Sequence, residues 1–126
     1  WQHVLEPLNG YLLLAQKIHS KNIKKLKQNW NFGPNISSCK SVKYLTDYLN
    51  KFFKLKIVKF EDKKSNFKPE TSVLRLSNYK SKKYLNWQPK WPINVSLDKI
   101  VYWYKKTPKE GAYNVCLKQI NEYLVN

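Results

Sequence analysis

The chain opens with the stretch Trp1-Gln2-His3-Val4-Leu5-Glu6-Pro7-Leu8-Asn9-Gly10-Tyr11-Leu12. Apolar residues recur in and beyond it at spacings of three and four, the pattern of one helix face: Val4, Leu8, Tyr11, Ala15 and Ile18. Pro7 suits the first turn of such a helix, where its missing N–H group costs little. Gly10 in a helix interior costs about 1 kcal/mol relative to Ala, so we expect another segment to pack closely against it.

Length and composition indicate one small folded domain of 126 residues, 42% of them hydrophobic. Met is absent and the chain opens inside a dense apolar stretch, so we expect further sequence ahead of Trp1 in the complete protein. The longest apolar run, residues 11–15, is far shorter than the roughly 20 residues of a membrane span. No secretion signal is visible, and Cys39 and Cys116 lack the spacing of a metal or disulfide framework. These features predict a cytoplasmic location.

The formal net charge of +16 raises the possibility of nucleic-acid binding. Arg75 is the only arginine among 24 basic residues, whereas recognition of phosphates and base edges favours the planar, two-pronged Arg side chain. We therefore interpret the lysines as a solvated surface. A free-standing basic module for nucleic acids or anionic membranes remains the alternative, and it predicts binding that weakens steeply with salt.

The remaining pattern predicts an α+β fold, helix-dominated with a few short strands. The expected strands are residues 30–34, 55–60 and 73–76, which are rich in β-branched or aromatic residues. A helix with Val42, Leu45, Leu49 and Phe52 on one face is expected to start at Ser37, Ser38 or Ser41. Another helix, residues 78–85, is expected to end at a left-handed Asn86.

Two further helices are expected near the end of the chain. Ser96 is predicted to cap the first of them. Its inward residues and those of the last helix follow from the helical spacing: Leu97, Ile100, Val101 and Tyr104 in the first, and Leu117, Ile120 and Leu124 in the second.

The sequence lacks the residues of a self-contained enzyme. Its three glycines, Gly10, Gly33 and Gly111, are too far apart for a phosphate-binding glycine-rich loop. Two Tyr-x-x-x-Lys matches, at Tyr79 and Tyr102, agree with chance for a chain so rich in both residues. His3 and His19 lie about 16 residues apart, too far for two ligands on one helix face, so no metal site is predicted. We expect neither catalytic nor cofactor-binding residues in this chain.

Read in order, these motifs resemble the C-terminal part of CDP-glucose 4,6-dehydratases, NAD-dependent enzymes of the extended short-chain dehydrogenase/reductase superfamily. Members carry a stretch like Arg-Pro-Trp-Gln-His-Val-Leu-Glu-Pro-Leu-Ser-Gly-Tyr, which residues 1–11 match from the Trp onward, with Asn9 in place of Ser. The other matches run through the rest of the chain: Trp30-Asn31-Phe32-Gly33-Pro34, Leu85-Asn86-Trp87-Gln88-Pro89-Lys90-Trp91, and Ile120-Asn121-Glu122-Tyr123.

The resemblance implies a function for a larger protein. Residues 1–126 are expected to form a single C-terminal lobe that binds the nucleotide-sugar, with the Rossmann half absent. That half would bind NAD and carry the catalytic Tyr-x-x-x-Lys pair, so this chain alone is expected to be inactive and to bind no cofactor. The full-length enzyme would convert CDP-glucose to CDP-4-keto-6-deoxyglucose and form a homo-oligomer. A lobe from a dehydratase or epimerase for another nucleotide-sugar is the nearer alternative.

The resemblance also implies three substrate-binding residues, Trp1, His3 and Glu70. Trp1 corresponds to an aromatic residue near the nucleotide, although an indole here also suits a core or interface. His3 is expected to order its own segment in preference to contacting a phosphate. Glu70 is placed to accept hydrogen bonds from ribose hydroxyls or, alternatively, to cap a turn. The chain departs from the family pattern at Pro69, where members have His.

A lobe without its partner half is further expected to expose one contiguous apolar patch, which marks a protein interface.

Overall fold

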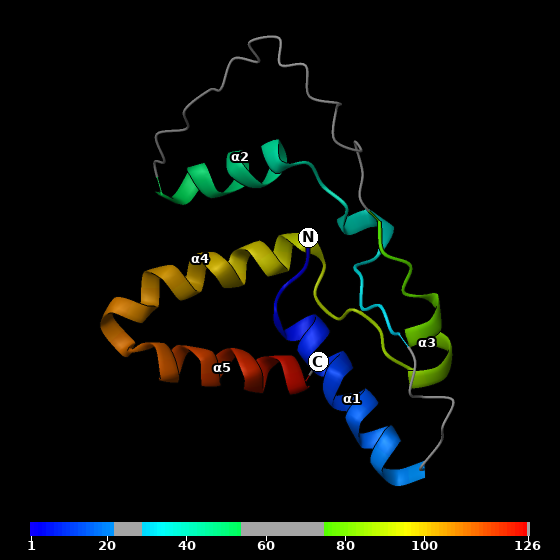
Figure 1. The fold of residues 1–126 in the computed structure, drawn as a ribbon. Coiled ribbons are helices and arrows are strands. Elements are labelled where there is room, and N and C mark those ends of the chain that lie inside the picture. The colour runs from blue at the N-terminus through cyan, green and yellow to red at the C-terminus, as the bar shows by residue number, and fades with distance from the viewer. Residues whose placement is uncertain (22–28, 54–74, 126) are drawn as a thin grey trace, which may run out of the picture.

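The computed structural model describes residues 1–21, 29–53 and 75–125. Helices make up all of its regular secondary structure within these ranges: α1 (Leu5–Lys21), the short 3-10 helix η2 (Ile36–Ser38), α2 (Val42–Phe53), α3 (Tyr79–Leu85), α4 (Ile93–Glu110) and α5 (Ala112–Val125). Figure 1 shows α4 and α5 as an antiparallel pair, with α2 running along α4 and α3 lying beside α1. The first turns of α1 cross the end of α5.

The tight connection between α4 and α5 depends on Gly111. Its backbone has φ +79, a conformation that residues with a side chain rarely adopt. Its N–H group donates to the Thr107 carbonyl at 3.0 Å. This residue ends α4 and lets the chain reverse into α5 at once.

The core of one half of the molecule is aromatic. Phe32, Leu85 and Trp87 are buried together, and the Phe32 and Trp87 rings meet edge to face with centroids 5.2 Å apart. Several partly buried residues pack around this cluster: Leu13, Leu14, Ile18 and Trp30. The cluster joins α1, the extended segment 29–35 and the end of α3, which are distant in sequence.

The prediction of an α+β fold is wrong, because the described residues contain no strand. The expected strand at 55–60 lies outside the described residues, as do positions 73 and 74 of the third. Residues 30–34 are extended, but side chains bond their carbonyl groups where a neighbouring strand would do so. Gln2 Nε2 donates to Phe32 O at 2.7 Å, Asn78 Nδ2 donates to Gly33 O at 2.9 Å, and the Ser81 hydroxyl donates to Asn31 O. These three carbonyl groups thereby have hydrogen-bond partners without a sheet.

Segments 29–35 and 75–78 nevertheless approach each other closely. A Cβ atom on Gly33 would lie 2.7 Å from the Leu76 carbonyl oxygen, so only glycine allows this contact.

Helix positions were predicted better than helix faces. The inward residues expected in α5, Leu117, Ile120 and Leu124, are exposed, and its buried residues are Val115, Gln119 and Tyr123. Val4, directly before α1, and Leu8 and Tyr11 within it are likewise exposed.

In α4 the expected face is partly right. Leu97 and Val101 are buried, whereas Tyr104 is 60% exposed. Ser96 does not cap this helix, because α4 starts three residues earlier at Ile93. The Ser96 hydroxyl is instead buried and donates to the Trp91 carbonyl at 3.5 Å.

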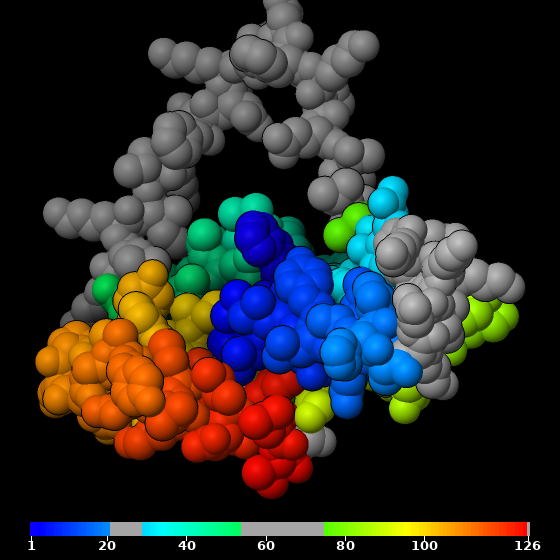
Figure 2. Space-filling model, turned by 60° about the horizontal axis from the view of Figure 1, so that its bottom comes forward, coloured from blue at the N-terminus to red at the C-terminus, as the bar shows by residue number. Residues whose placement is uncertain are grey.

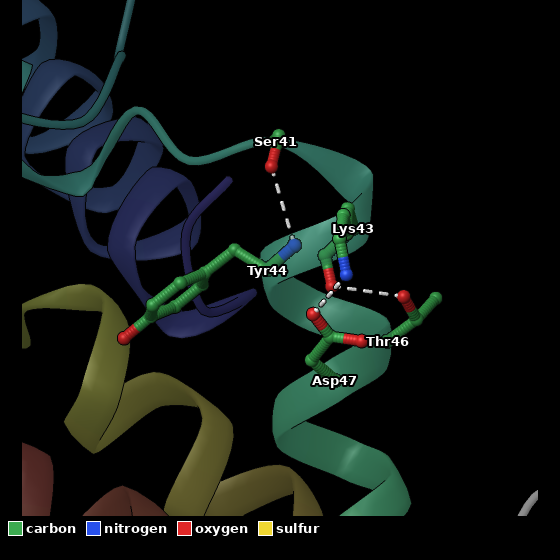
Figure 3. A network of polar contacts seen from close by, with 5 residues as sticks. All are labelled: Ser41, Lys43, Tyr44, Thr46 and Asp47. Carbon is green, nitrogen blue, oxygen red and sulfur yellow. Dashed lines mark hydrogen bonds and ion pairs between the residues drawn. The ribbon is translucent and has the colours of Figure 1, made fainter.

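Helix α2 starts with a side-chain cap at Ser41, one of the three predicted positions. The Ser41 hydroxyl oxygen accepts the Tyr44 N–H group at 3.2 Å, as Figure 3 shows. One turn further, Lys43 and Asp47 form an exposed ion pair at 2.7 Å. Because α2 buries none of its residues, this local bonding matters more than it would in a buried helix.

We expect Ser41→Ala to destabilise the start of α2 by about 1 kcal/mol, the usual cost of a lost cap. Amide hydrogen exchange should become faster at Tyr44 and its neighbours, while exchange in α5 stays unchanged. Ser37→Ala is the matched control, because Ser37 lies in η2 and does not cap α2. Equal exchange rates at Tyr44 in the wild type and Ser41→Ala would contradict the capping role.

Candidate functional site

A buried carboxylate lies where the two ends of the chain meet. Glu6, in the first turn of α1, has no exposed surface. Its Oε1 accepts the Trp91 N–H group at 2.7 Å, and its Oε2 accepts the Lys90 N–H group at 3.0 Å and the Tyr123 hydroxyl at 2.8 Å. Its backbone carbonyl accepts the Trp87 indole N–H group at 3.1 Å. One residue thus connects α1 with the 87–91 turn and α5.

The sequence around the junction explains its geometry. Asn86 adopts φ 55 and ends α3 with a left-handed C-cap, as predicted, and this reversal sends the chain into the 87–91 turn. The rings of Trp91 and Tyr123 meet edge to face with centroids 5.0 Å apart. Lys90 extends across the Tyr123 ring and donates from Nζ to the Tyr123 carbonyl at 2.9 Å.

The electrostatics of the junction favour a neutral Tyr123. Burial, followed by the hydrogen bond to Glu6, raises the pKa of the Tyr123 hydroxyl far above its usual range. Ionisation would leave the phenolate facing a carboxylate in a buried site. Because Tyr123 keeps its proton for Glu6 and both backbone donors are engaged, the junction has a structural role and offers no free acid or base.

An apolar cleft opens beside this junction. Its volume is about 370 Å³, and its walls come from the start of α1, from α4 and from α5: they include His3, Val4, Leu8, Ile100, Trp103 and Ile120. On the face shown in Figure 2, the blue N-terminal segment and α1 lie directly beside α4 and α5. Of the exposed residues named above, Val4, Leu8, Tyr104 and Ile120 line this one cleft.

His3 is buried at the edge of the cleft and orders the start of α1. Its Nδ1 accepts the Leu5 N–H group at 3.3 Å, and its ring meets Trp91 edge to face with centroids 4.9 Å apart. Burial lowers the pKa of His3, the positive charge of Lys99 lowers it further, and a hydrogen bond with Gln119 acts in the opposite direction. These contacts agree with the expected ordering role.

The lowered pKa of His3 predicts a pH-dependent stability. Below about pH 6.5 the unfolded chain takes up a proton that the folded chain resists, so the free energy of unfolding should fall as the pH drops through this range. His3→Asn keeps an acceptor for the Leu5 N–H group but does not titrate. Urea unfolding at pH 7.5 and 5.5 should therefore show a smaller decrease for His3→Asn. His19→Asn, on an exposed part of α1, should retain the wild-type decrease, and identical decreases in all three proteins would contradict the prediction.

The three predicted substrate-binding residues are not brought together by the described structure. Trp1 is 58% exposed, and its neighbour His3 is turned into the interior. Glu70 lies outside the described residues. Trp1 is thus accessible for stacking, whereas His3 is committed to internal contacts.

The sequence did not indicate that Glu6, Tyr123 and Gln119 make the buried contacts of this site. Glu6 and Tyr123 lie within motifs that resemble the dehydratase family, and this was the available signal. A single acidic residue amid apolar neighbours gives no indication that a distant turn will donate to it.

The described residues give little support for a catalytic Tyr-x-x-x-Lys pair, a metal site or a membrane span. Lys83 Nζ donates to the Tyr79 hydroxyl at 3.2 Å, so one Tyr-x-x-x-Lys match is in contact, but its Tyr is 64% exposed. Within residues 1–21, 29–53 and 75–125, no cluster of His, Cys, Asp or Glu could hold a metal ion. None of the helices in these ranges is long and apolar enough to cross a membrane.

The fold and site define a helical, lysine-rich module whose opening motif, 87–91 turn and last helix close on one buried carboxylate. No protein-family model matches the chain. It is 32% identical over 131 residues to CDP-glucose 4,6-dehydratase from Salmonella typhimurium, a match that covers 98% of this chain and 34% of that enzyme. The resemblance inferred from the motifs is confirmed, and the chain spans about one third of the length of this dehydratase relative.

Proposed function

We propose that the chain is the C-terminal, substrate-binding part of a CDP-glucose 4,6-dehydratase, with NAD bound by a preceding Rossmann half. The observation that carries this proposal is the similarity to a dehydratase along 98% of the chain. The full enzyme would convert CDP-glucose to CDP-4-keto-6-deoxyglucose in the cytoplasm as a homo-oligomer. This chain alone lacks a glycine-rich loop, and it would neither bind NAD nor turn over substrate.

The Glu6 junction supports the proposal structurally. The three stretches that resemble the dehydratase family at residues 1–11, 85–91 and 120–123 are far apart in sequence. They meet at one carboxylate: the first stretch supplies Glu6, and the other two supply its hydrogen-bond donors Trp91 and Tyr123. The resemblance therefore covers residues that cooperate in one piece of structure, which a chance match of separate motifs would not explain.

The apolar cleft supports a missing partner half. Val4, Leu8 and Tyr104 line it, and each is more than two-fifths exposed. A protein surface this apolar is usually covered. The occupant we propose is the remainder of the dehydratase, because the relative is about three times as long as this chain. The +16 charge makes a second copy of this chain a poor occupant.

Within this proposal the three predicted residues have separate roles. Trp1 presents an exposed indole face on which a cytosine base can stack. His3 holds the start of α1 and so positions Trp1, two residues before it. Glu70 accepts hydrogen bonds from ribose hydroxyls.

The function is tested by assaying two proteins with NAD and CDP-glucose: the 126-residue chain, and the chain joined to the sequence that precedes it in its gene. The 4-keto product should form only with the longer protein. Product from the short chain would disprove its inactivity, and no product from the longer one would disprove the proposed activity. Competition among CDP-, UDP- and GDP-glucose separates a CDP-specific enzyme from the nearer alternative.

The role of Trp1 is tested in the same full-length enzyme. Trp1→Ala should raise the KM for CDP-glucose about tenfold, within the usual range for loss of one base–aromatic stack. Trp1→Phe should restore most of the affinity. An unchanged KM in Trp1→Ala would contradict a stacking role for Trp1.

A further inference from the structure

The outward side of α5 carries a stripe of apolar and aromatic residues. Its four members are exposed: Tyr113 at 76%, Leu117 at 42%, Ile120 at 39% and Leu124 at 66%. Ile120 also lines the apolar cleft, whereas the other three do not. In Figure 1, α5 lies at the edge of the fold, with α4 along one side and α1 across its end. The α5 stripe is therefore left uncovered by the described residues.

The spacing within the α5 stripe suits contact with another helix. Its members follow one another at four, three and four residues, which is the spacing of the seam between two packed helices. At 3.6 residues per turn they fall within a sector of about 60° of the helix circumference. A stripe this narrow matches the width of a single helix better than it matches a broad surface.

The order of the spacings reads the same in both directions along α5. If two copies of α5 lie antiparallel about a twofold axis, Tyr113 of one copy faces Leu124 of the other. By the same symmetry, Leu117 faces Ile120 of the other copy. A twofold contact requires this kind of self-complementarity, whereas a stripe that packs against an unrelated helix does not. The spacing therefore favours a second copy of the chain as the occupant.

The charges of α5 do not oppose such a contact. The net charge of +16 keeps copies of the chain apart in general. In α5, however, the charged residues are Lys118 and Glu122 alone, and both form ion pairs with α4. Lys118 pairs with Glu110 at 2.7 Å, and Glu122 pairs with Lys99. More distant lysines are screened beyond about 8 Å at physiological ionic strength. The residues that flank the stripe are neutral: Asn114, Cys116 and Asn121.

We propose that two copies of the chain associate through the α5 stripe as an antiparallel helix pair about a twofold axis. Leu117 and Ile120 form the centre of the contact, and Tyr113 and Leu124 form its ends. The proposal gives a contact face to the homo-oligomer of the proposed function. It does not rest on dehydratase activity, because it requires neither substrate nor NAD.

Sedimentation equilibrium of the 126-residue chain at physiological ionic strength tests the proposal, and the wild type should form dimers. Tyr113→Asp and Leu124→Lys should each raise the dissociation constant at least about tenfold, because each removes an apolar contact on both sides of the axis. Both substitutions preserve the helix, since an acid suits its start and a base suits its end. Tyr113→Asp also lowers the net charge, so a general effect of charge would strengthen association instead.

An equimolar mixture of the two variants tests the antiparallel arrangement. In the mixed dimer, the new carboxylate at position 113 meets the new ammonium group at position 124, and the second Tyr113–Leu124 contact is intact. The mixture should therefore associate at least about tenfold more tightly than either variant alone, because opposite charges beside a helix seam set partner choice and orientation. A parallel pair would bring neither charge to its partner, so absence of this recovery would overturn the proposal.

Val42→Asp is the matched control. It places the same charge on an apolar residue that is 62% exposed, but at the start of α2. It should leave the dissociation constant of the chain within twofold of the wild-type value. A monomeric wild type at the highest attainable concentration, or equal weakening by Val42→Asp and Tyr113→Asp, would overturn the proposal.

The protein that includes the preceding sequence provides a second measurement. There Leu124→Lys should lower the mass of the assembly. An unchanged mass would show that the preceding part of the protein covers the α5 stripe, and it would overturn the proposal. Formation of the 4-keto product from CDP-glucose is measured separately, so failure of this proposal and failure of the proposed function can be told apart.

Discussion

Glu6→Ala should lower the free energy of unfolding by about 4 kcal/mol, a large part of the stability of a domain this small. The substitution leaves the N–H groups of Lys90 and Trp91 and the Tyr123 hydroxyl without their shared acceptor. Each unsatisfied buried donor costs about 1–3 kcal/mol. Water admitted by the shorter side chain will recover only part of this loss. Urea unfolding followed by Trp fluorescence measures the effect.

Glu6→Gln should be milder, with a loss of about 1–2 kcal/mol. The amide oxygen can remain at the Oε1 position, facing the Trp91 N–H group, while the Tyr123 hydroxyl rotates to accept from the new NH₂ group. Asp47→Ala is the exposed control. It removes only the surface pair with Lys43 and should cost about 0.5 kcal/mol. A Glu6→Ala protein as stable as Asp47→Ala would refute the central role of the junction.

Gly10→Ala should destabilise the fold by about 2 kcal/mol, although Ala is the better helix former. A Cβ atom at this position would lie 2.5 Å from Phe32 Cε1 and 2.7 Å from Phe32 Cγ. The Phe32 ring cannot easily move, because it is 7% exposed and lies edge to face with both Tyr11 and Trp87. The clash therefore outweighs the gain of about 1 kcal/mol in helix propensity.

A double-mutant cycle identifies this clash as the cause. In the Phe32→Ala background, Gly10→Ala should become neutral or stabilising, with a coupling energy above about 1 kcal/mol. Gly111→Ala is the matched substitution. A Cβ atom there would meet nothing within 4 Å, but the φ of +79 is unfavourable for Ala. Its cost should be the same with either residue at position 32, and additive effects at Gly10 and Phe32 would contradict the packing explanation.

The local features of the fold were largely predictable from short stretches. The helical spacing after Val4, the cap at Ser41 and the left-handed Asn86 each depend on residues within one or two turns, and the structure confirms all three. The close packing against Gly10 was also expected, although its partner Phe32 was not. Of the candidate site, the resemblance to dehydratases was confirmed, whereas the roles of Trp1, His3 and Glu70 in binding the substrate stay predictions.

Strands and buried faces were beyond local reasoning. Residues 30–34 have the composition of a strand, yet a strand also requires a neighbour at hydrogen-bonding distance. Side chains such as those of Gln2 and Asn78 fill that role here. In α5 the buried side carries Tyr123, which donates to Glu6. The apolar residues Leu117, Ile120 and Leu124 therefore lie on the exposed side.

Residue spacing alone was thus enough to specify where helices form, since a helix is built from contacts between residues three and four positions apart. Tertiary structure decided which helix faces are buried and that Glu6 is the common acceptor for both ends of the chain. Such contacts join residues that are distant in sequence. The energy of these contacts depends on which distant residues are packed together, and a short stretch of sequence does not specify this.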